Sequence, residues 1–426
     1  MTRVLITNAY SALNRGDGAI ILGMVESLRR APELAGADIV VSSADPDDGR
    51  RYDFPVVPSF HSLMNALRGG GRLHCLYFLL VLLPASVLWA LVRRRLGQDL
   101  PVPRGLRALM REYAASDLVV AAGGGYLYTT SGLHGNVMLL VHLHTFVMGY
   151  LLGKPVYLYA QSIGPFAAPF QERLVRAALR PVRMVETREH RSTELLARWR
   201  LPSPVYETAD AAFLISPSAP DHLPEKTGRS PRIGMTVRRW FRDDRLQEEY
   251  EREVARFVVH LTLERGAEVV LLPQVAVVGA DDDRRVARRV AALADNPDGV
   301  RLVENDFQPC ELQWLCGRMD LFVGTRMHSN IFALSMGVPA LAIAYQPKTA
   351  GIMEQLGLGE LVLPMEGLTS GRLAAGFERL CREAPAVRES LQRVLPRVRE
   401  AAERAGRLIA EDFATVSGGA GRGPVS

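Results

Sequence analysis

Short apolar runs alternate with longer amphipathic segments along nearly the whole chain, and this alternation limits the possible folds more than any other feature. Runs of four or five apolar residues are typical of buried strands in a parallel sheet, and the longer segments have helical spacing. The pattern therefore predicts an α/β fold built from βα units. The expected strands are Val4–Thr7, Ile39–Ser42, Leu118–Ala121, Val156–Tyr159, Met184–Thr187, Ile233–Val237, Val269–Leu272, Leu321–Val323 and Ala340–Ala344.

The chain is long enough for two domains, because it has 426 residues and one hydrophobic core rarely exceeds about 300. Residues 216–231 are rich in Pro, Ser and charge, which predicts a linker between a first domain (1–215) and a second (232–390). Residues 391–416 predict a C-terminal helix, and residues 417–426 a disordered tail. We expect two doubly wound, Rossmann-like domains facing a central cleft, with ligands at the carboxyl ends of the strands.

Composition narrows the class of protein. The 51 basic and 46 acidic residues are spread along the chain without a basic stripe, so we expect no nucleic-acid partner. The four cysteines form no CxxC pair, which indicates a reducing compartment and no zinc site. The N-terminus lacks the apolar region and cleavage site of a signal peptide, so the predicted location is the cytoplasm.

One apolar stretch, Leu76–Val92, carries no charge and lies in an expected helical insertion near residues 73–95. Arg72 precedes it, and Arg93, Arg94 and Arg95 follow. Its 17 residues are at the short limit for crossing a bilayer, which takes about 20. Three interpretations remain open here: a buried helix pair, a helix lying in the membrane interface, and a membrane span, of which the span fits the surrounding α/β pattern least.

Two glycine-containing turns follow expected strands. Asn14, Arg15, Gly16 and Asp17 connect the first strand to a helix, where backbone N–H groups can bind an anion and Asp17 can cap the helix. The alternative is a capped turn without a ligand. Gly124 is the middle of three glycines after the strand at Leu118–Ala121, where either a ligand or tight packing requires the absence of a side chain.

Polar side chains follow two further strands of the first domain. Gln161 comes after the strand at Val156, and Arg188 comes directly after the strand that ends at Thr187. Because the carboxyl ends of parallel strands share one edge of the sheet, we expect both side chains to face the cleft. An exposed surface arginine is the alternative for Arg188.

The most informative segment lies in the second domain, where Arg326 and His328 follow the strand at Leu321 and begin a helix. Arginine binds carboxylate or phosphate through two hydrogen bonds, and histidine transfers protons near neutral pH. Lys348 follows the next strand, so we expect it at the same edge. Glu354 lies further along the next helix and is a candidate for ribose or substrate binding.

Two other groups are weaker candidates. His142 and His144 are two residues apart on an expected helix and so point in different directions, which argues against metal binding. The run Asp281–Asp283 is interpreted as a solvated helix start, with metal binding left open. We therefore predict no metal site.

Taken together, these residues form a recognisable pattern, and the chain resembles the polysaccharide pyruvyl transferase family from about Val4 to about Leu361. The matching segments are NRGD after the first strand, DLVVAAGGGYL, QSIGPF, ETRE, GTRMHSNIFALSMGVPALAIAYQPK and the EQLG that follows. The resemblance implies a fold like that of GT-B glycosyltransferases. It also implies that the catalytic residues are Arg188, His328 and Lys348, with Arg326, Asn14, Gly16, Asp17, Gly124, Gln161 and Glu354 binding substrate.

The activity implied by the resemblance is transfer of pyruvate from phosphoenolpyruvate to a sugar of an exopolysaccharide or a lipid-linked oligosaccharide of the cell envelope. Phosphoenolpyruvate is then a donor substrate, and no cofactor is expected. The stretch Leu76–Val92 allows contact with the inner face of the cell membrane.

Two other functions remain open from the sequence. The first is a GT-B glycosyltransferase that uses a nucleotide sugar. The second is a protein without enzyme activity that binds a glycan or a partner.

Overall fold

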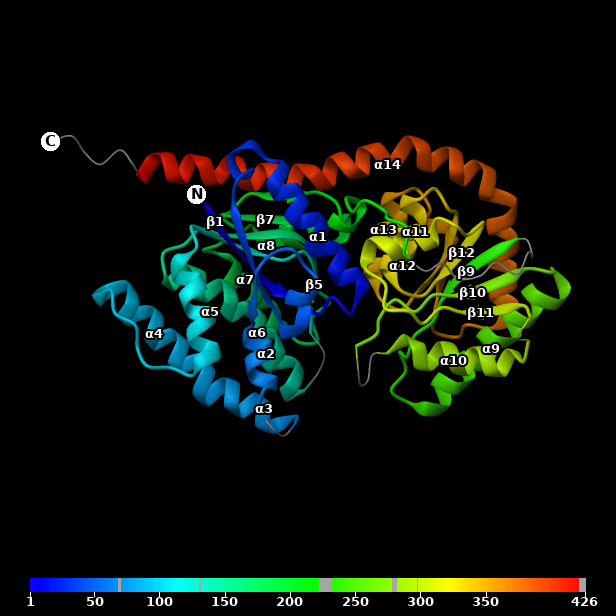
Figure 1. Ribbon diagram of the computed structural model, residues 1–426, viewed down its shortest axis with the longest axis horizontal. Coiled ribbons are helices and arrows are strands. Elements are labelled where there is room, and N and C mark those ends of the chain that lie inside the picture. Colours follow the sequence, from blue (N-terminus) through cyan, green and yellow to red (C-terminus); the bar gives the residue numbers. More distant parts are fainter. Residues whose placement is uncertain (68–69, 130–131, 222–230, 278–281, 297, 421–426) are drawn as a thin grey trace. The chain divides into compact units, whose positions relative to one another are not determined.

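The computed structural model describes residues 1–67, 70–129, 132–221, 231–277, 282–296 and 298–420 (Figure 1). The expected linker and tail therefore fall largely outside the described residues, at 222–230 and 421–426. The chain divides into two compact units by its internal contacts. Unit 1 comprises Met1–Ala12, Ile20–Leu214 and Glu400–Ser426, and unit 2 comprises Leu13–Ala19 and Ile215–Arg399.

Unit 1 is built on a parallel sheet with the order β3-β2-β1-β4-β6-β7-β8, to which β5 adds alongside β6. The order reverses between β1 and β4, which is the switch point of a doubly wound fold. The strands are β1 (Arg3–Ala9), β2 (Asp38–Ser43), β3 (Val56–Pro58), β4 (Leu118–Ala121), β5 (Gly124–Leu127), β6 (Val156–Ile163), β7 (Met184–Thr187) and β8 (Val205–Glu207).

Helices cover both faces of this sheet, because successive strand residues point to opposite sides. Leu5 of β1 joins the apolar cluster formed with α2 and with α4–α8, while Val4 and Ile6 join the cluster formed with α1 and α14. The helices are α1 (Arg15–Arg30), α2 (Phe60–Asn65), α3 (Arg72–Tyr77), α4 (Leu83–Leu96), α5 (Arg104–Ala115), α6 (Leu133–Leu151), α7 (Pro169–Leu179) and α8 (His190–Trp199), with 3-10 turns at Pro32–Leu34, Pro46–Arg50 and Ala211–Phe213.

Unit 2 contains a second parallel sheet with the order β11-β10-β9-β12-β13-β14. Its strands are β9 (Arg232–Thr236), β10 (Glu268–Leu271), β11 (Val300–Leu302), β12 (Leu321–Gly324), β13 (Ala340–Ala344) and β14 (Val362–Pro364). Its helices are α9 (Asp244–Val259), α10 (Asp283–Ala294), α11 (Pro309–Cys316), α12 (Met327–Ser335) and α13 (Pro347–Gln355), with a π turn at His260–Glu264 and a 3-10 turn at Gly359–Leu361. The predicted α/β fold with two Rossmann-like parallel sheets is thus confirmed.

Two segments differ from the sequence prediction, one in the unit it belongs to and one in its range. Leu13–Ala19 follows the first strand but makes its contacts within unit 2. The C-terminal helix α14 runs over Ser370–Ala420 rather than from residue 391, and its interior contains Pro385 and Pro396. Prolines usually mark helix ends, so the sequence places the start too late. The residues of α14 up to Arg399 belong to unit 2, and those that follow belong to unit 1.

Candidate functional site

The carboxyl ends of β12 and β13 carry three of the predicted site residues of unit 2, which are Arg326, His328 and Lys348. Since β9, β12 and β13 are neighbours and parallel, the residues after each strand lie at one edge of the sheet. Arg326 directly precedes α12, His328 is the second residue of that helix, and Lys348 is the second residue of α13. The structure thus places these three cationic or titratable side chains at two neighbouring helix starts, as the sequence predicted.

Arg326 is held in place by a buried carboxylate. Its Nη2 and Nε donate to Asp283 at 2.6 and 3.1 Å, and both side chains are almost fully buried. Asp283 also accepts hydrogen bonds from the backbone N–H groups of Gln274 and Val275. The interpretation of Asp281–Asp283 as a solvated helix start is therefore wrong for Asp283, because a partner distant in the sequence buries it. Asp281 lies outside the described residues.

The segment Leu13–Ala19 is fixed to unit 2 by Arg15. The buried Arg15 guanidinium pairs with Asp306 at 2.6 Å and donates to the Phe307 carbonyl at 2.9 Å. The Arg15 backbone N–H donates to the Gln274 carbonyl at 3.1 Å. Arg15 therefore acts as an anchor that holds the start of α1 beside the edge of the second sheet.

Within this anchored segment, Asn14 and not Asp17 caps α1. The Asn14 side chain accepts from the Gly16 backbone N–H at 3.2 Å and donates to the Asp17 carboxylate at 2.7 Å. Gly16 lies directly against His328, and a Cβ atom at position 16 would overlap the imidazole ring. The structure thus brings together the predicted residues Gly16 and His328, which are 312 positions apart in the sequence.

A cation–aromatic cluster next to these residues was not predicted from the sequence. The Arg238 guanidinium lies 4.3 Å from the ring centre of Tyr345 and 5.3 Å from that of Trp240, and the two rings are 4.5 Å apart. Burial by itself raises the pKa of the Tyr345 phenol, but the positive charges of Arg238, Lys348 and Arg326 outweigh burial and lower it. Three cations of unit 2 therefore act on one phenol.

A signal for this cluster was present in the sequence. Arg238, Arg239 and Trp240 follow the strand at Ile233, just as Arg326 and Lys348 follow theirs. The reasoning that made Arg326 and Lys348 candidate site residues therefore also applies to the two adjacent arginines beside Trp240.

Glu354 is placed differently from the other predicted residues of unit 2. It lies in the last turn of α13 with an exposed side chain, whereas Lys348 lies in the first turn. Their separation of six positions corresponds to about 9 Å along a helix axis. The structure therefore does not bring Glu354 to the strand ends.

In unit 1, Arg188 is buried rather than exposed, so the surface alternative is wrong. Only 1% of its side chain is accessible, and its Nη1 pairs with Asp210 at 2.6 Å. Its Nε donates to the Ser162 hydroxyl at 2.8 Å, and its backbone N–H to the Gln161 carbonyl at 3.2 Å. Arg188 is thus preorganised by side chains from two other segments of the same unit.

Gln161 and Gly124 shape the same edge of the first sheet. The Gln161 side chain is buried and donates to the Ala122 carbonyl at the end of β4. Gly124 pairs with Gln161 across β5 and β6, and its φ of 132° favours glycine strongly. Gln161 therefore stabilises this edge of the sheet through a hydrogen bond, and Gly124 allows the backbone conformation found there.

Each of the two histidines of α6 has a polar partner, and burial favours the neutral form of both. His144 lies 2.7 Å from the Ser86 hydroxyl, and His142 lies 3.3 Å from the Asn8 side-chain oxygen. Burial lowers the pKa of His144 to about 4 and that of His142 to about 3. Over the described ranges of the chain, no three His, Cys, Asp or Glu side chains are grouped so as to hold a metal ion.

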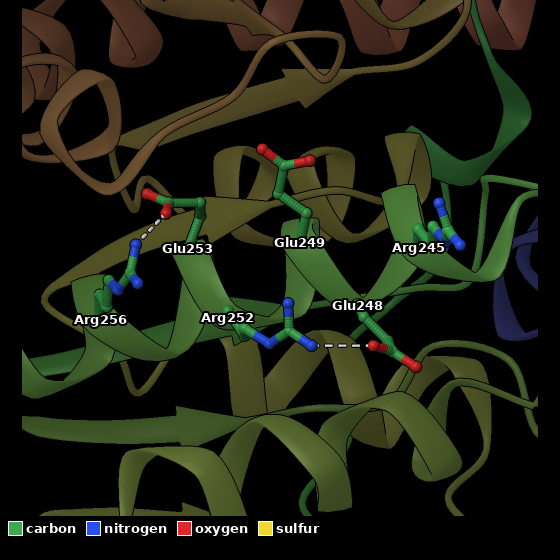
Figure 2. Close-up of a pocket in the computed structure, with 6 residues that line it drawn as sticks. All are labelled: Arg245, Glu248, Glu249, Arg252, Glu253 and Arg256. Atoms are coloured by element: carbon green, nitrogen blue, oxygen red, sulfur yellow. Dashed lines mark hydrogen bonds and ion pairs between the residues drawn. The ribbon is translucent and has the colours of Figure 1, made fainter.

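A surface hollow on α9 is of a different kind (Figure 2). The charges along it are matched within the helix, since Arg252 pairs with Glu248 at 2.8 Å and Arg256 pairs with Glu253. Such a face of alternating charge is typical of a solvated helix, and we assign it no ligand. Its lining residues are Arg245, Glu248, Glu249, Arg252, Glu253 and Arg256.

Comparison with solved structures identifies the fold. The UDP-GlcNAc 2-epimerase from Neisseria meningitidis, solved with bound UDP-GlcNAc, matches with a TM-score of 0.60 and 10% identity over 97% of this chain and 100% of the epimerase. The trehalose 6-phosphate synthase from Burkholderia multivorans matches with a TM-score of 0.53 and 12% identity over the full length of both chains. At these identities the likeness shows the fold alone, which is GT-B-like.

Sequence comparison identifies the family. The amylovoran biosynthesis protein AmsJ of Erwinia amylovora is 28% identical over 401 residues, which cover 88% of this chain and 90% of AmsJ. The sequence model of the family described as polysaccharide pyruvyl transferase matches residues 14–347. That range includes the anchored turn at Gly16, the buried Arg188 and the start of α12 at His328. The chain belongs to the polysaccharide pyruvyl transferase family.

Proposed function

We propose that this protein transfers the pyruvyl group of phosphoenolpyruvate to hydroxyls of a sugar in a polysaccharide or a lipid-linked oligosaccharide, forming a pyruvate ketal. Membership of the family supports the donor and the reaction class. The similarity to a protein named for amylovoran biosynthesis supports a role in polysaccharide assembly.

The observation that carries the proposal is the cationic cluster of unit 2. Phosphoenolpyruvate carries its carboxylate and its phosphate on the same carbon, C2, so its binding site needs several positive charges. The Arg238 guanidinium lies 4.3 Å from the centre of the Tyr345 ring, and Arg326 and Lys348 stand at the starts of the neighbouring helices α12 and α13. Asp283 offsets part of this charge, because it pairs with Arg326.

In the proposed reaction, His328 donates a proton to the methylene carbon of phosphoenolpyruvate, and C2 becomes electrophilic. A sugar hydroxyl attacks C2 and its proton returns to the His328 imidazole, and the bond from C2 to the phosphate oxygen breaks. A second hydroxyl of the same sugar bonds to C2 and closes the ketal, and its proton leaves with the phosphate. The net products are the ketal and inorganic phosphate, with the cations stabilising the developing phosphate charge. Arg188 is included as a catalytic residue on the family resemblance.

We place the protein, as part of this proposal, in the cytoplasm. All four cysteines are free thiols, and Cys75 and Cys316 are buried. Free buried thiols are compatible with a reducing compartment. A cytoplasmic enzyme also has direct access to phosphoenolpyruvate.

The test is calorimetric titration of the full-length protein with phosphoenolpyruvate. We expect saturable binding that Lys348→Ala weakens by about tenfold or more, since a charged hydrogen bond contributes about 1.5–3 kcal/mol. His328→Gln is expected to retain binding, because its proposed task is proton transfer. Arg393→Gln, an exposed arginine on α14, serves as the matched control for loss of positive charge.

The other functions predict different results. No response to phosphoenolpyruvate together with saturable binding of UDP-GlcNAc would contradict the proposal and support a nucleotide-sugar glycosyltransferase. No response to either molecule would support a glycan-binding protein without enzyme activity.

A further inference from the structure

One helical segment of unit 1 exposes a continuous apolar face. The segment runs from Arg72 to Leu96 through α3, a π turn at Phe78–Leu82, and α4. Among the residues the structure describes, it is the one helix long and apolar enough to cross a membrane, and one third of its most apolar window is buried. The π turn comes just before Pro84, whose missing N–H group interrupts regular helical bonding.

The buried face of this segment is committed to the core of unit 1. Its buried residues are Cys75, Phe78, Leu82, Ser86, Trp89 and Ala90, and five of the six follow one another at intervals of three or four positions. All of them except Ser86 belong to the apolar cluster that also contains residues of α5 and α6. The Ser86 hydroxyl lies 2.7 Å from His144 of α6 and fixes the orientation.

The exposed face is just as regular, and it is entirely apolar. From residue 73 to residue 92 the sequence contains no Asp, Glu, Lys or Arg. Leu73, Leu76, Leu80, Pro84, Leu88 and Leu91 are exposed at intervals of three or four positions, which places them on one side of the helix over about 27 Å. The large apolar side chains of this face, including Val81 beside Leu80, are Leu73 (47% accessible), Leu76 (49%), Leu80 (70%), Val81 (39%), Leu88 (56%) and Leu91 (37%).

Positive charge surrounds this face. Between residues 72 and 111 the sequence has seven arginines and one acidic residue, Asp99. Asp99 pairs with Arg93 at 3.2 Å and with Arg111 at 3.1 Å, which leaves a large basic excess. Arg72, Arg95 and Arg104 are exposed at the two ends of the segment and at the start of α5 (Figure 1).

We propose that this face docks unit 1 onto an anionic phospholipid bilayer, with the leucines in the acyl boundary and the arginines at the lipid phosphates. An interfacial helix with one apolar face and basic flanks binds membranes in this way. A membrane span is disfavoured, because it would expose the Ser86–His144 pair and the buried stripe to lipid.

A second copy of the chain would fit this apolar face less well than a bilayer does. A twofold interface brings the same patch of each subunit together, so arginines would face arginines. An anionic bilayer offers the opposite charge and an apolar interior at once. This inference does not depend on the identity of the donor, so its failure and that of the proposed function are separately observable.

The first experiment is flotation of the full-length protein with vesicles of phosphatidylcholine alone or with about one third phosphatidylglycerol. We expect flotation with the anionic vesicles only, and loss of flotation at high salt because the interaction is screened. The double variant Leu80→Glu/Leu88→Glu is expected to reduce partitioning by about tenfold or more, since each leucine contributes through its buried apolar area. The matched control is Leu246→Glu/Leu263→Glu, two similarly exposed leucines of unit 2.

The second experiment removes charge. Arg72→Gln/Arg95→Gln is expected to weaken binding to anionic vesicles by about fivefold per arginine. Arg382→Gln/Arg393→Gln, on the exposed side of α14, is the matched control and is expected to bind like the wild type. Melting curves verify that each variant is folded.

Two outcomes would overturn the proposal. One is flotation of Leu80→Glu/Leu88→Glu equal to that of the wild type. The other is absence of vesicle binding together with a dimer, seen by light scattering, that the same variant dissociates. In that case the face is an interface between copies of this chain.

Discussion

At the scale of single residues, the buried charges of this protein differ in whether they have a partner. Arg188 is matched by Asp210 and Arg326 by Asp283, so each charge is neutralised where it is buried. Sequence reasoning identified both arginines from their position after a strand. It missed both carboxylates, because Asp283 is 43 positions from Arg326 and nothing in its local pattern indicates burial.

Glu186 of β7 is the contrasting case, and it leads to a prediction about pH. The side chain is fully buried, and burial raises its pKa well above the usual value despite the opposing effects of the Ala160 backbone and Arg404. Below the unfolded-state pKa, both states hold the proton. As the pH rises past about 4.5, the unfolded chain releases the proton while the folded protein keeps it, so the free energy of unfolding falls until the folded-state pKa is reached.

We therefore expect Glu186→Gln to be more stable than the wild type at pH 7. The difference in the free energy of unfolding should grow with pH from about 4.5 by up to about 1.4 kcal/mol per pH unit. Urea unfolding at several pH values measures it. Glu33→Gln, at an exposed glutamate of the same unit, should show no such trend. A constant difference between Glu186→Gln and the wild type across this range would contradict the assignment.

At the scale of elements, the central strands could be predicted from the sequence and the edges could not. The predicted ranges of β4, β7 and β13 match the structure. Strands β4 and β13 are runs of four and five apolar residues, which are typical of strands with both faces of the sheet covered. Strands β3, β5, β8, β11 and β14 were missed. All of these except β5 have three residues and lie at the end of a sheet, and three residues are too few for a periodic signal.

Among the contacts between elements, the one between the starts of α1 and α12 most affects the candidate site. Gly16 at the start of α1 packs on His328 at the start of α12, so no side chain fits at position 16. We expect Gly16→Ala to displace the anchored turn and to weaken phosphoenolpyruvate binding by about tenfold or more. Calorimetry measures this effect. Gly371→Ala on α14, where a Cβ meets open space, is the control.

If Gly16→Ala binds phosphoenolpyruvate as the wild type does, the turn at Asn14–Asp17 has no part in donor binding. The sequence proposed Gly16 because the backbone N–H groups of its turn can bind an anion, whereas the structure gives a steric reason from a distant residue. A contact of this kind cannot be derived from local sequence, since it depends on how Leu13–Ala19 is anchored by Arg15.

At the scale of the whole molecule, neither unit is a continuous stretch of chain. Unit 1 is completed by residues after Glu400, which return from unit 2 along α14. Ala405, Ile409 and Ala410 are fully buried in the same apolar cluster as Val4 and Ile6 of β1. Asp412 accepts a hydrogen bond from the Tyr157 hydroxyl at 2.8 Å and pairs with Arg183 at 2.7 Å. The end of α14 is therefore a structural part of unit 1.

This arrangement predicts the effect of truncation. Deleting the chain from Glu400 onward removes several buried apolar side chains, each worth about 1.5–3 kcal/mol, and a domain's total stability is only about 5–15 kcal/mol. We expect the amides of β6 and β7 to lose most of their protection from hydrogen exchange, while those of β9 and β12 keep theirs. A chain ending at Val416, which retains every buried contact named above, should exchange like the full-length protein. Equal protection of β6 and β7 in the two truncated chains would show that unit 1 folds without α14, and the assignment of the helix to both units would then be wrong.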